Sequence, residues 1–215
     1  MEVNAVQPLI AVSTAGLAGL LILFTGDKAF WRNLWSTLAS VIAFIAVWSM
    51  LPGALAGQIH VQEVLNLAGL TLTFRVDYLG LLFALVSSSM WLLVNIYTIG
   101  YIAHEHNKQR FFAFFALSMF SAFGIAMAEN LFTLFIFYEL LSLFTYPLVM
   151  HIGTEEALKA GSKYLIYTLG GGGFLLIAII ITYFITGNIS LSQPGVFSLS
   201  DGPNLLRVVF FLYLI

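Results

Sequence analysis

The apolar positions of this chain form long runs that polar and charged residues separate. A helix needs about 20 mostly apolar residues to cross the hydrocarbon core of a bilayer. Six runs come close to this length, and they cover 6–25, 34–51, 78–101, 111–128, 131–150 and 158–186. The pattern therefore predicts an all-α polytopic membrane protein with six transmembrane helices.

The last residues, 205–215, are apolar except for Arg207 and predict the start of a seventh helix. Such a segment reaches only about half of the bilayer core at 1.5 Å per residue. A chain end inside hydrocarbon leaves backbone carbonyls unpaired. We therefore expect either further sequence or another chain at this end.

The segment before the third run has a different period. Apolar and polar residues alternate over 59–64 and again over 70–76, with Asn66 and Gly69 between the two stretches. Alternation of this kind is typical of a strand with one buried face. We predict a β-hairpin over 58–76 that lies on the outer surface of the membrane.

Composition agrees with a membrane protein and excludes several other classes. Hydrophobic residues make up 60% of the 215 residues and charged residues 8%, and the mean hydropathy is +0.99. A soluble domain has about 25% charged residues, so this chain is not a soluble globule. A net charge of −2 provides no basic surface for nucleic acid, so nucleic acid is not an expected partner. The absence of cysteine excludes disulfides, iron–sulfur clusters and thiolate zinc sites in this chain.

The basic residues predict the orientation in the membrane. Six of the eight lie on one side of the predicted bundle, namely Lys28, Arg32, Lys108, Arg110, Lys159 and Lys163. Only Arg75 and Arg207 lie on the other side. Because basic residues concentrate in cytoplasmic loops, we predict a multi-pass protein of the cell membrane whose N-terminus is outside.

Glu139 is the charge that this arrangement places near the middle of a predicted span, in segment 131–150. A carboxyl there costs on the order of 2.5–3.5 kcal/mol on insertion scales, so it must face protein or water. At 100° per residue, Ser142 and Tyr146 lie within about 60° of Glu139 and continue a polar stripe. Such a carboxyl is suited to take up and release a proton. The alternative is a structural carboxyl bonded to a neighbouring helix.

Lys163 is the second candidate, because it lies about one turn into the last full segment and shares a helix face with Lys159. Two interpretations are equally open. Lys163 is either a cationic partner of Glu139, or its long side chain reaches the lipid headgroups. We predict Glu139 and Lys163 as proton-relay residues, with Ser142, Tyr146 and Lys159 as supporting polar groups.

Two further features have simpler interpretations. The glycine run 170–173 favours close helix packing over a bend or a π-bulge. His104 and His106 flank Glu105 in a predicted cytoplasmic loop, and we interpret them as solvated rather than as a metal site because the ligands are too few. No metal site and no cofactor are predicted.

Residues 130–149, with their Phe137-Tyr138-Glu139 run, resemble the fifth helix of the antiporter-like subunits. These subunits occur in respiratory complex I, in membrane-bound hydrogenases and in Mrp-type multisubunit sodium/proton antiporters. Residues 156–168 resemble the start of the sixth helix, and 74–77 resemble the entry to the third. The resemblance covers nearly the whole chain from about residue 70 onward, and the pattern of segments three to six looks closest to the D-type Mrp subunit.

The resemblance implies a bundle of about fourteen helices built from two inverted repeats of about five. It makes Glu139 the glutamate of the fifth helix, coupled to a lysine on a broken seventh helix. Lys163 matches a basic position of the sixth helix. The seventh-helix lysine would lie beyond Ile215, so the chain as given does not hold a complete proton path.

We therefore expect the N-terminal part of a proton-translocating subunit in a multisubunit membrane complex. Its expected partners are the lipid bilayer, other membrane subunits, H⁺ and, in one version, Na⁺. It has no catalytic or redox centre of its own, so the activity of an NADH-quinone oxidoreductase would reside in partner chains. Two alternatives stay open: a structural or assembly subunit without an ion path, and half of an unrelated dimeric secondary transporter.

Overall fold

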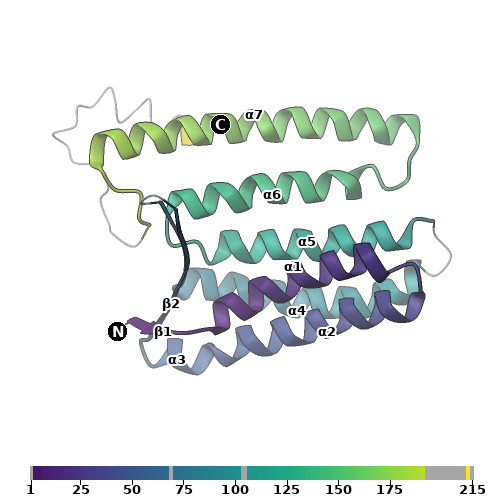
Figure 1. Cartoon of the computed structure of the whole chain (residues 1–215), viewed down its shortest axis with the longest axis horizontal. Helices are drawn as coiled ribbons and strands as arrows, with labels where there is room; N and C mark the ends of the chain where they lie inside the picture. Colours follow the sequence, from purple (N-terminus) through teal and green to yellow (C-terminus); the bar gives the residue numbers. More distant parts are fainter. Residues whose placement is uncertain (1, 68–69, 103–105, 192–211, 214–215) are drawn as a thin grey trace.

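The computed structural model describes residues 2–67, 70–102, 106–191 and 212–213. Within these ranges, six helices are long and apolar enough to cross a membrane. They run along one common direction, and a small β-sheet lies at the end of the bundle where the N-terminus is found (Figure 1). The predicted fold class, an all-α polytopic membrane protein with a short β-hairpin, is confirmed.

The long helices are α1 Gln7–Thr25, α2 Ala29–Ser49, α4 Tyr78–Tyr101, α5 Lys108–Ala126, α6 Leu131–Val149 and α7 Glu155–Thr186. A short helix, α3 Leu51–Leu55, follows α2 directly. Together α2 and α3 form one apolar stretch, Ala29–Leu55.

Three helices begin earlier than the apolar pattern suggests, because charged residues at their starts are accommodated within the helix. α2 begins at Ala29, whereas the predicted segment begins at residue 34. The Arg32 guanidinium donates to the carbonyl of Gly26 at 3.4 Å and lies over the ring of Phe112, 5.5 Å from its centroid. α5 and α7 likewise begin three residues before the predicted positions. Long charged side chains allow a helix to extend past its apolar segment toward the headgroups.

The sheet has three strands in the order β1-β2-β3, with bounds β1 Glu2–Asn4, β2 Ile59–Leu67 and β3 Leu70–Val76. β2 and β3 pair antiparallel, which confirms the predicted hairpin. β1 pairs with β2 in parallel, and Glu2 forms an ion pair with Arg75 on β3. This strand was not predicted, because three residues are too few to show alternation.

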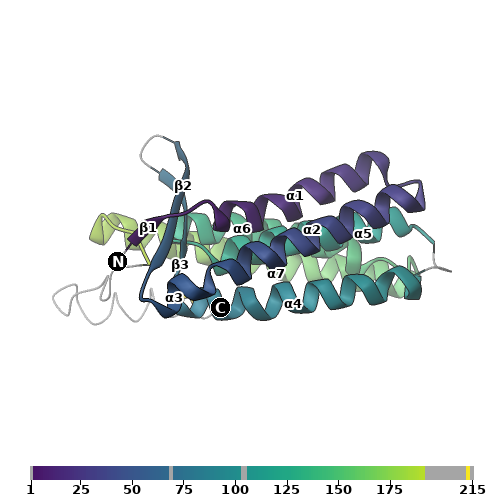
Figure 2. The ribbon, with the colours of Figure 1, turned by 90° about the horizontal axis from the view of Figure 1, so that it is seen from below.

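The helices pack in an order that differs from their order in the chain. α1 lies against both α2 and α5, α2 lies against α4, α5 against α6, and α6 against α7 (Figures 1 and 2). Small residues bring α1 close to α5. A methyl carbon at Gly16 would lie 2.9 Å from Cδ2 of Phe120, and one at Gly19 would lie 2.8 Å from Cδ2 of Leu117. Close approach at small residues is a common basis of helix association in membranes.

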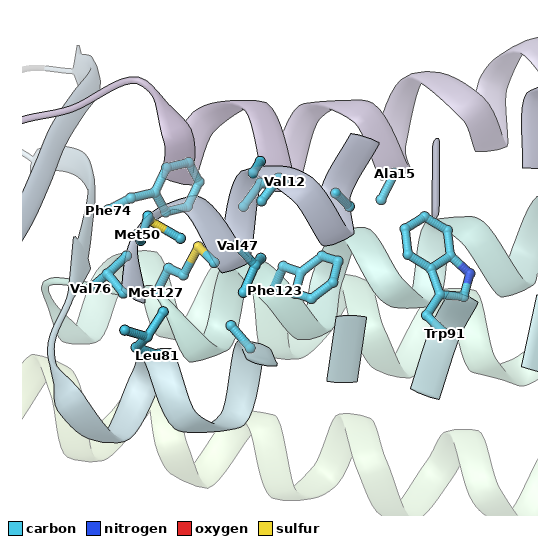
Figure 3. Close-up of a cluster of buried hydrophobic side chains, with 14 of the residues drawn as sticks. Val12, Ala15, Val47, Met50, Phe74, Val76, Leu81, Trp91, Phe123 and Met127 are labelled. Carbon is cyan, nitrogen blue, oxygen red and sulfur yellow. The ribbon is translucent and has the colours of Figure 1, made fainter. Parts of the chain in front are cut away.

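The core lies where α1, α2, α4 and α5 meet the inner side of β3 (Figure 3). Its labelled side chains are Val12, Ala15, Val47, Met50, Phe74, Val76, Leu81, Trp91, Phe123 and Met127. Backbone bonds also join β3 to the turn before α6: Arg75 N–H donates to Met127 O at 2.7 Å, and Glu129 N–H donates to Thr73 O at 3.0 Å. The hairpin is therefore anchored to the bundle and fixes the turn between α5 and α6.

Some predictions fall on residues outside the described ranges. The predicted seventh segment, 205–215, is described only at Leu212 and Tyr213, and the Tyr213 hydroxyl shares a hydrogen bond of 3.0 Å with Thr182 Oγ1 on α7. His104 and Glu105 of the predicted solvated loop also lie outside the described residues.

Candidate functional site

The hairpin fixes the start of α6. Asn130 caps this helix, because its Oδ1 accepts from the backbone N–H of Thr133 at 2.8 Å. The Asn130 amide also donates to the carbonyl of Thr71 on β3 at 2.8 Å. A cap of this kind stabilises a helix by about 1 kcal/mol. The height of each α6 residue is thus set relative to the sheet.

Glu139 lies at the centre of α6, ninth of its 19 residues, and is half-buried. Its carboxylate makes no hydrogen bond or ion pair with any other residue that the structure describes. It lies instead against α7, in space that Gly172 leaves open. A methyl carbon at Gly172 would lie 2.7 Å from the carboxyl carbon of Glu139 and closer still to Oε1. Glu139 therefore occupies the contact between α6 and α7, which we call the α6–α7 seam.

Further contacts define the α6–α7 seam. Thr145 Oγ1 and the Tyr164 hydroxyl share a hydrogen bond of 2.6 Å. A methyl carbon at Gly161 would lie 3.0 Å from Met150 Sδ and 3.3 Å from Cε2 of Tyr146. Glycines of α7 thus allow α6 to approach at two levels.

The glycine run 170–173 does not interrupt α7, which is continuous from Glu155 to Thr186. Close packing, rather than a bend, is therefore the correct interpretation of the run, and Gly172 is the position where that packing occurs. Gly170 and Gly173 have no heavy atom within 4 Å of an added methyl carbon.

The two predicted supporting groups of α6 have different environments. Tyr146 is half-buried and lies in the seam near Gly161. Ser142 is buried, and its hydroxyl donates to the carbonyl of Tyr138 on its own helix at 3.2 Å. Tyr146 is therefore associated with the same seam as Glu139, whereas the hydrogen bond of Ser142 stays within α6.

The structure does not bring the two predicted lysines to Glu139. Lys163 is exposed and lies nine residues before Gly172, which on a helix means about 13–14 Å along the axis and about 180° around it. Of the two interpretations left open for Lys163, a direct pairing with Glu139 is not formed in this structure, because α7 presents Gly172 to the carboxylate and places Lys163 about 180° away. Lys159 pairs with Glu155 at 2.7 Å, and both side chains are exposed. That Lys163 takes part in proton movement stays a prediction.

Sequence reasoning missed the residue that contacts Glu139. The glycine run was recognised as a packing feature, but a run of four glycines does not reveal which one faces another helix. The register between α6 and α7 decides this, and it follows from the anchored start of α6 and the contacts at Thr145 and Gly161.

Two histidines, His106 and His151, lie in the connections before α5 and after α6. The rings of His106 and His151 stack with 5.7 Å between their centroids, and Phe111 meets His151 edge-on at 5.3 Å. Across the described ranges, no group of three or more His, Asp or Glu side chains is placed to hold a metal ion. The stack joins the connection before α5 to the connection after α6.

Comparison with known protein families gives two matches. Residues 128–215 match the family described as NADH:quinone oxidoreductase/Mrp antiporter, transmembrane part. Residues 65–112 match the family described as NADH-ubiquinone oxidoreductase (complex I), chain 5 N-terminus. The first match includes α6, α7 and Glu139.

Curated relatives agree with these matches. The antiporter subunit mnhA2 of Staphylococcus saprophyticus is 31% identical over 160 residues, which cover 73% of this chain and 20% of that protein. NAD(P)H-quinone oxidoreductase chain 5 of Picosynechococcus is 28% identical over 193 residues, which cover 89% of this chain and 26% of that protein. The chain therefore spans about a fifth to a quarter of the length of these relatives.

Solved structures share the fold. A chain of the membrane-bound sulfane sulfur reductase, an archaeal respiratory membrane complex, matches with a TM-score of 0.79 at 17% identity, over 97% of this chain and 42% of that chain. A chain of the Mrp complex from Dietzia matches with a TM-score of 0.78 at 19% identity, over 96% of this chain and 22% of that chain.

Six apolar helices and a short hairpin define a multi-pass membrane protein, and a half-buried carboxylate lies in the middle of one of its helices. The chain belongs to the antiporter-like family of membrane subunits shared by Mrp antiporters and NADH:quinone oxidoreductases. The narrower resemblance to the D-type Mrp subunit stays a prediction, since the Mrp-type relative described above carries the name of an A-type subunit.

Proposed function

We propose that this chain is part of a proton-translocating subunit of a multisubunit membrane complex, and that Glu139 takes up and releases the proton. The observation that supports this most directly is the place of Glu139. Its carboxylate lies halfway along an apolar helix, in the α6–α7 seam, without a bonded partner among the described residues. An ionisable group inside a membrane is a functional site by default, because placing it there is expensive.

In this proposal, the carboxylate of Glu139 exchanges one proton with neighbouring water or hydroxyl groups. A carboxylate that no fixed cation holds can change its charge as the proton arrives and leaves. The hydrogen-bonded hydroxyls of Thr145 and Tyr164 and the ring of Tyr146 lie along the same seam toward the start of α7. They provide donors and acceptors along which a proton can pass toward that end of the bundle.

The relatives support the wider setting of the proposal. One curated relative is named Na(+)/H(+) antiporter subunit A1, and both structural matches are chains of multisubunit membrane complexes. We propose that this chain likewise assembles with other membrane subunits in the cell membrane. Exchange of protons for sodium is the finer version of the proposal.

A substitution at Glu139 tests the proposal. We expect Glu139→Gln to abolish proton transport by the intact complex, because the amide has nearly the shape of the carboxyl but does not exchange a proton at neutral pH. The measurement is the initial rate of proton uptake into membrane vesicles. Glu139→Asp, which keeps the carboxyl, is expected to retain part of the rate.

Glu129→Gln is a matched control, since it makes the same chemical change outside the α6 helix. Glu129 accepts a hydrogen bond from Ser190 at the end of the bundle near the sheet. We expect Glu129→Gln to transport protons at close to the wild-type rate. Unchanged transport in Glu139→Gln would contradict the proposal and favour a structural subunit.

A further inference from the structure

Gly172 of α7 lies in close contact with the carboxylate of Glu139 on α6. Gly172 is buried, whereas Gly170 and Gly173 are exposed. A methyl carbon at Gly172 would overlap Oε1 of Glu139 and would lie 3.4 Å from Oε2. Neither Gly170 nor Gly173 has a heavy atom within 4 Å of the same position. Among Gly170, Gly172 and Gly173, an added methyl group is therefore excluded only at Gly172, the position that faces the carboxylate.

The local geometry explains how the contact arises. α6 is anchored to the sheet through Asn130, and α7 is held against α6 by the Thr145–Tyr164 hydrogen bond and by the close approach at Gly161. These contacts fix the distance between the two helices at the level of Glu139. At this separation a hydrogen on Gly172 leaves room for the carboxylate, and any larger side chain does not.

We propose that Gly172 is a positioning residue for Glu139: the missing side chain at this one position of α7 keeps the carboxylate inside the α6–α7 seam. The transport part of this inference rests on the proposed function of Glu139. The placement of the carboxylate is a separate property, and it can be measured without any transport.

A methyl group at residue 172 acts on the carboxylate rather than on the fold. The atoms that it would meet are the far end of a flexible Glu side chain and not the backbone of α6. Alanine also favours a helix over glycine by about 1 kcal/mol. The chain therefore folds with alanine at this position, and the carboxylate turns out of the seam. Displacement of a reacting group by about 1 Å can lower a rate by roughly 100-fold.

The test compares Gly172→Ala with Gly173→Ala in the intact complex. Both variants make the same change in the same helix, but only the first meets the carboxylate. The first readout is the rate at which a hydrophobic carbodiimide labels Glu139, measured by mass spectrometry of the α6 peptide. We expect faster labelling in Gly172→Ala, because its carboxyl lies outside the seam, and the wild-type rate in Gly173→Ala.

The second readout is proton transport in vesicles as a function of pH. We expect Gly172→Ala to lower the rate by roughly tenfold or more and to displace its pH profile, while Gly173→Ala keeps both. A double variant combines Gly172→Ala with Glu139→Asp. The aspartate is one methylene shorter than glutamate, so its carboxylate does not overlap the methyl group at residue 172. This pair is expected to recover part of the transport that Gly172→Ala loses.

Each outcome bears on a different claim. Equal labelling of Gly172→Ala and Gly173→Ala overturns the inference. Faster labelling of Gly172→Ala together with normal transport in Glu139→Gln supports the inference and overturns the proposed function. If Gly172→Ala does not accumulate, it is combined with Glu139→Ala, which removes the overlap. The pair should then accumulate like Glu139→Ala alone, and its failure to do so also overturns the inference.

Discussion

The glycines of this bundle face different atoms of neighbouring helices. The facing atoms decide whether a change of glycine to alanine moves a side chain or lowers the stability of the protein. Gly172 faces a flexible carboxylate, which can turn away from an added methyl group. Gly124 on α5 faces the ring of Phe137 on α6, which is 3% exposed and is held between Phe74 and Phe120 at 5.6 and 5.1 Å between ring centroids. At the residue scale, one glycine affects a side-chain position and the other affects stability.

We expect Gly124→Ala to destabilise the protein by about 1–3 kcal/mol, because the ring of Phe137 has no space into which to move. The measurement is the thermal unfolding midpoint of the purified complex in detergent. Gly100→Ala on α4 is the control, since an added methyl group there meets no heavy atom within 4 Å. A midpoint for Gly124→Ala equal to that of Gly100→Ala would show that the Phe137 ring does move.

At the scale of elements, the three-stranded sheet acts as the fixed point from which α6 is positioned. The sheet contains the N-terminal strand β1 and the hairpin strands β2 and β3. Backbone hydrogen bonds connect β3 to the turn between α5 and α6. His60 of β2 is buried at its base. Its ring lies next to Gly53 of α3, where an added methyl carbon would be 2.9 Å from Cε1, and its Nδ1 has no partner among the described residues.

Burial lowers the pKa of His60 below its ordinary value of 6.5, because the charged imidazolium is poorly solvated there. Well above pH 6.5 the ring is neutral in both the packed and the detached sheet, so it makes no pH-dependent contribution there. Below pH 6.5 the detached sheet takes up a proton more readily. We therefore expect the packing of the sheet to weaken as pH falls from 6.5 toward the lower pKa of the packed state.

Amide hydrogen exchange of the strands at pH 7.5 and 5.5, corrected for intrinsic rates, measures this effect. His60→Gln should lose the extra exchange at the lower pH. The variant keeps the other charged groups of the sheet and of its connection to α4, namely Glu2, Glu63, Arg75 and Asp77. The same pH dependence in His60→Gln as in the wild type would assign the effect to one of these groups instead.

At the scale of the whole molecule, the sheet and the basic connections lie at opposite ends of the bundle (Figure 1). Lys28 lies in the connection after α1, Lys108 begins α5 after the α4–α5 connection, and Lys159 lies in the second turn of α7 after the α6–α7 connection. This separation supports the prediction that the sheet and the N-terminus are outside the cell, because basic residues favour the cytoplasmic side.

Single cysteines test the orientation, since the sequence contains no cysteine that would interfere. We expect a membrane-impermeant maleimide added to intact cells to label Val64→Cys, whose parent side chain is exposed on β2. Asp27→Cys, between α1 and α2, should be labelled only after the membrane is opened. The reverse pattern would invert the orientation.

The sequence predicted the spans and the hairpin because each depends on local patterns. A run of about 20 apolar residues or a two-residue alternation is visible without knowledge of the fold. Strand β1 was not predicted, since its pairing with β2 joins Glu2–Asn4 to residues more than fifty positions away. α2 and α5 begin at Ala29 and Lys108, a few residues before the apolar runs begin, because a charged residue with a long side chain does not by itself end a helix.

The features of the candidate site likewise fall into those that the sequence predicted and those that depend on the tertiary structure. The sequence by itself placed Glu139 near the middle of an apolar run that is long enough to cross a membrane, because such a run is visible without knowledge of the fold. Only the tertiary structure decided that Gly172 faces Glu139 and that Lys163 lies on the opposite side of α7. The physical reason is register: the hydrogen bonds of Asn130 and Thr145 set the heights of two helices, and side-chain contacts between helices follow from those heights rather than from either sequence alone.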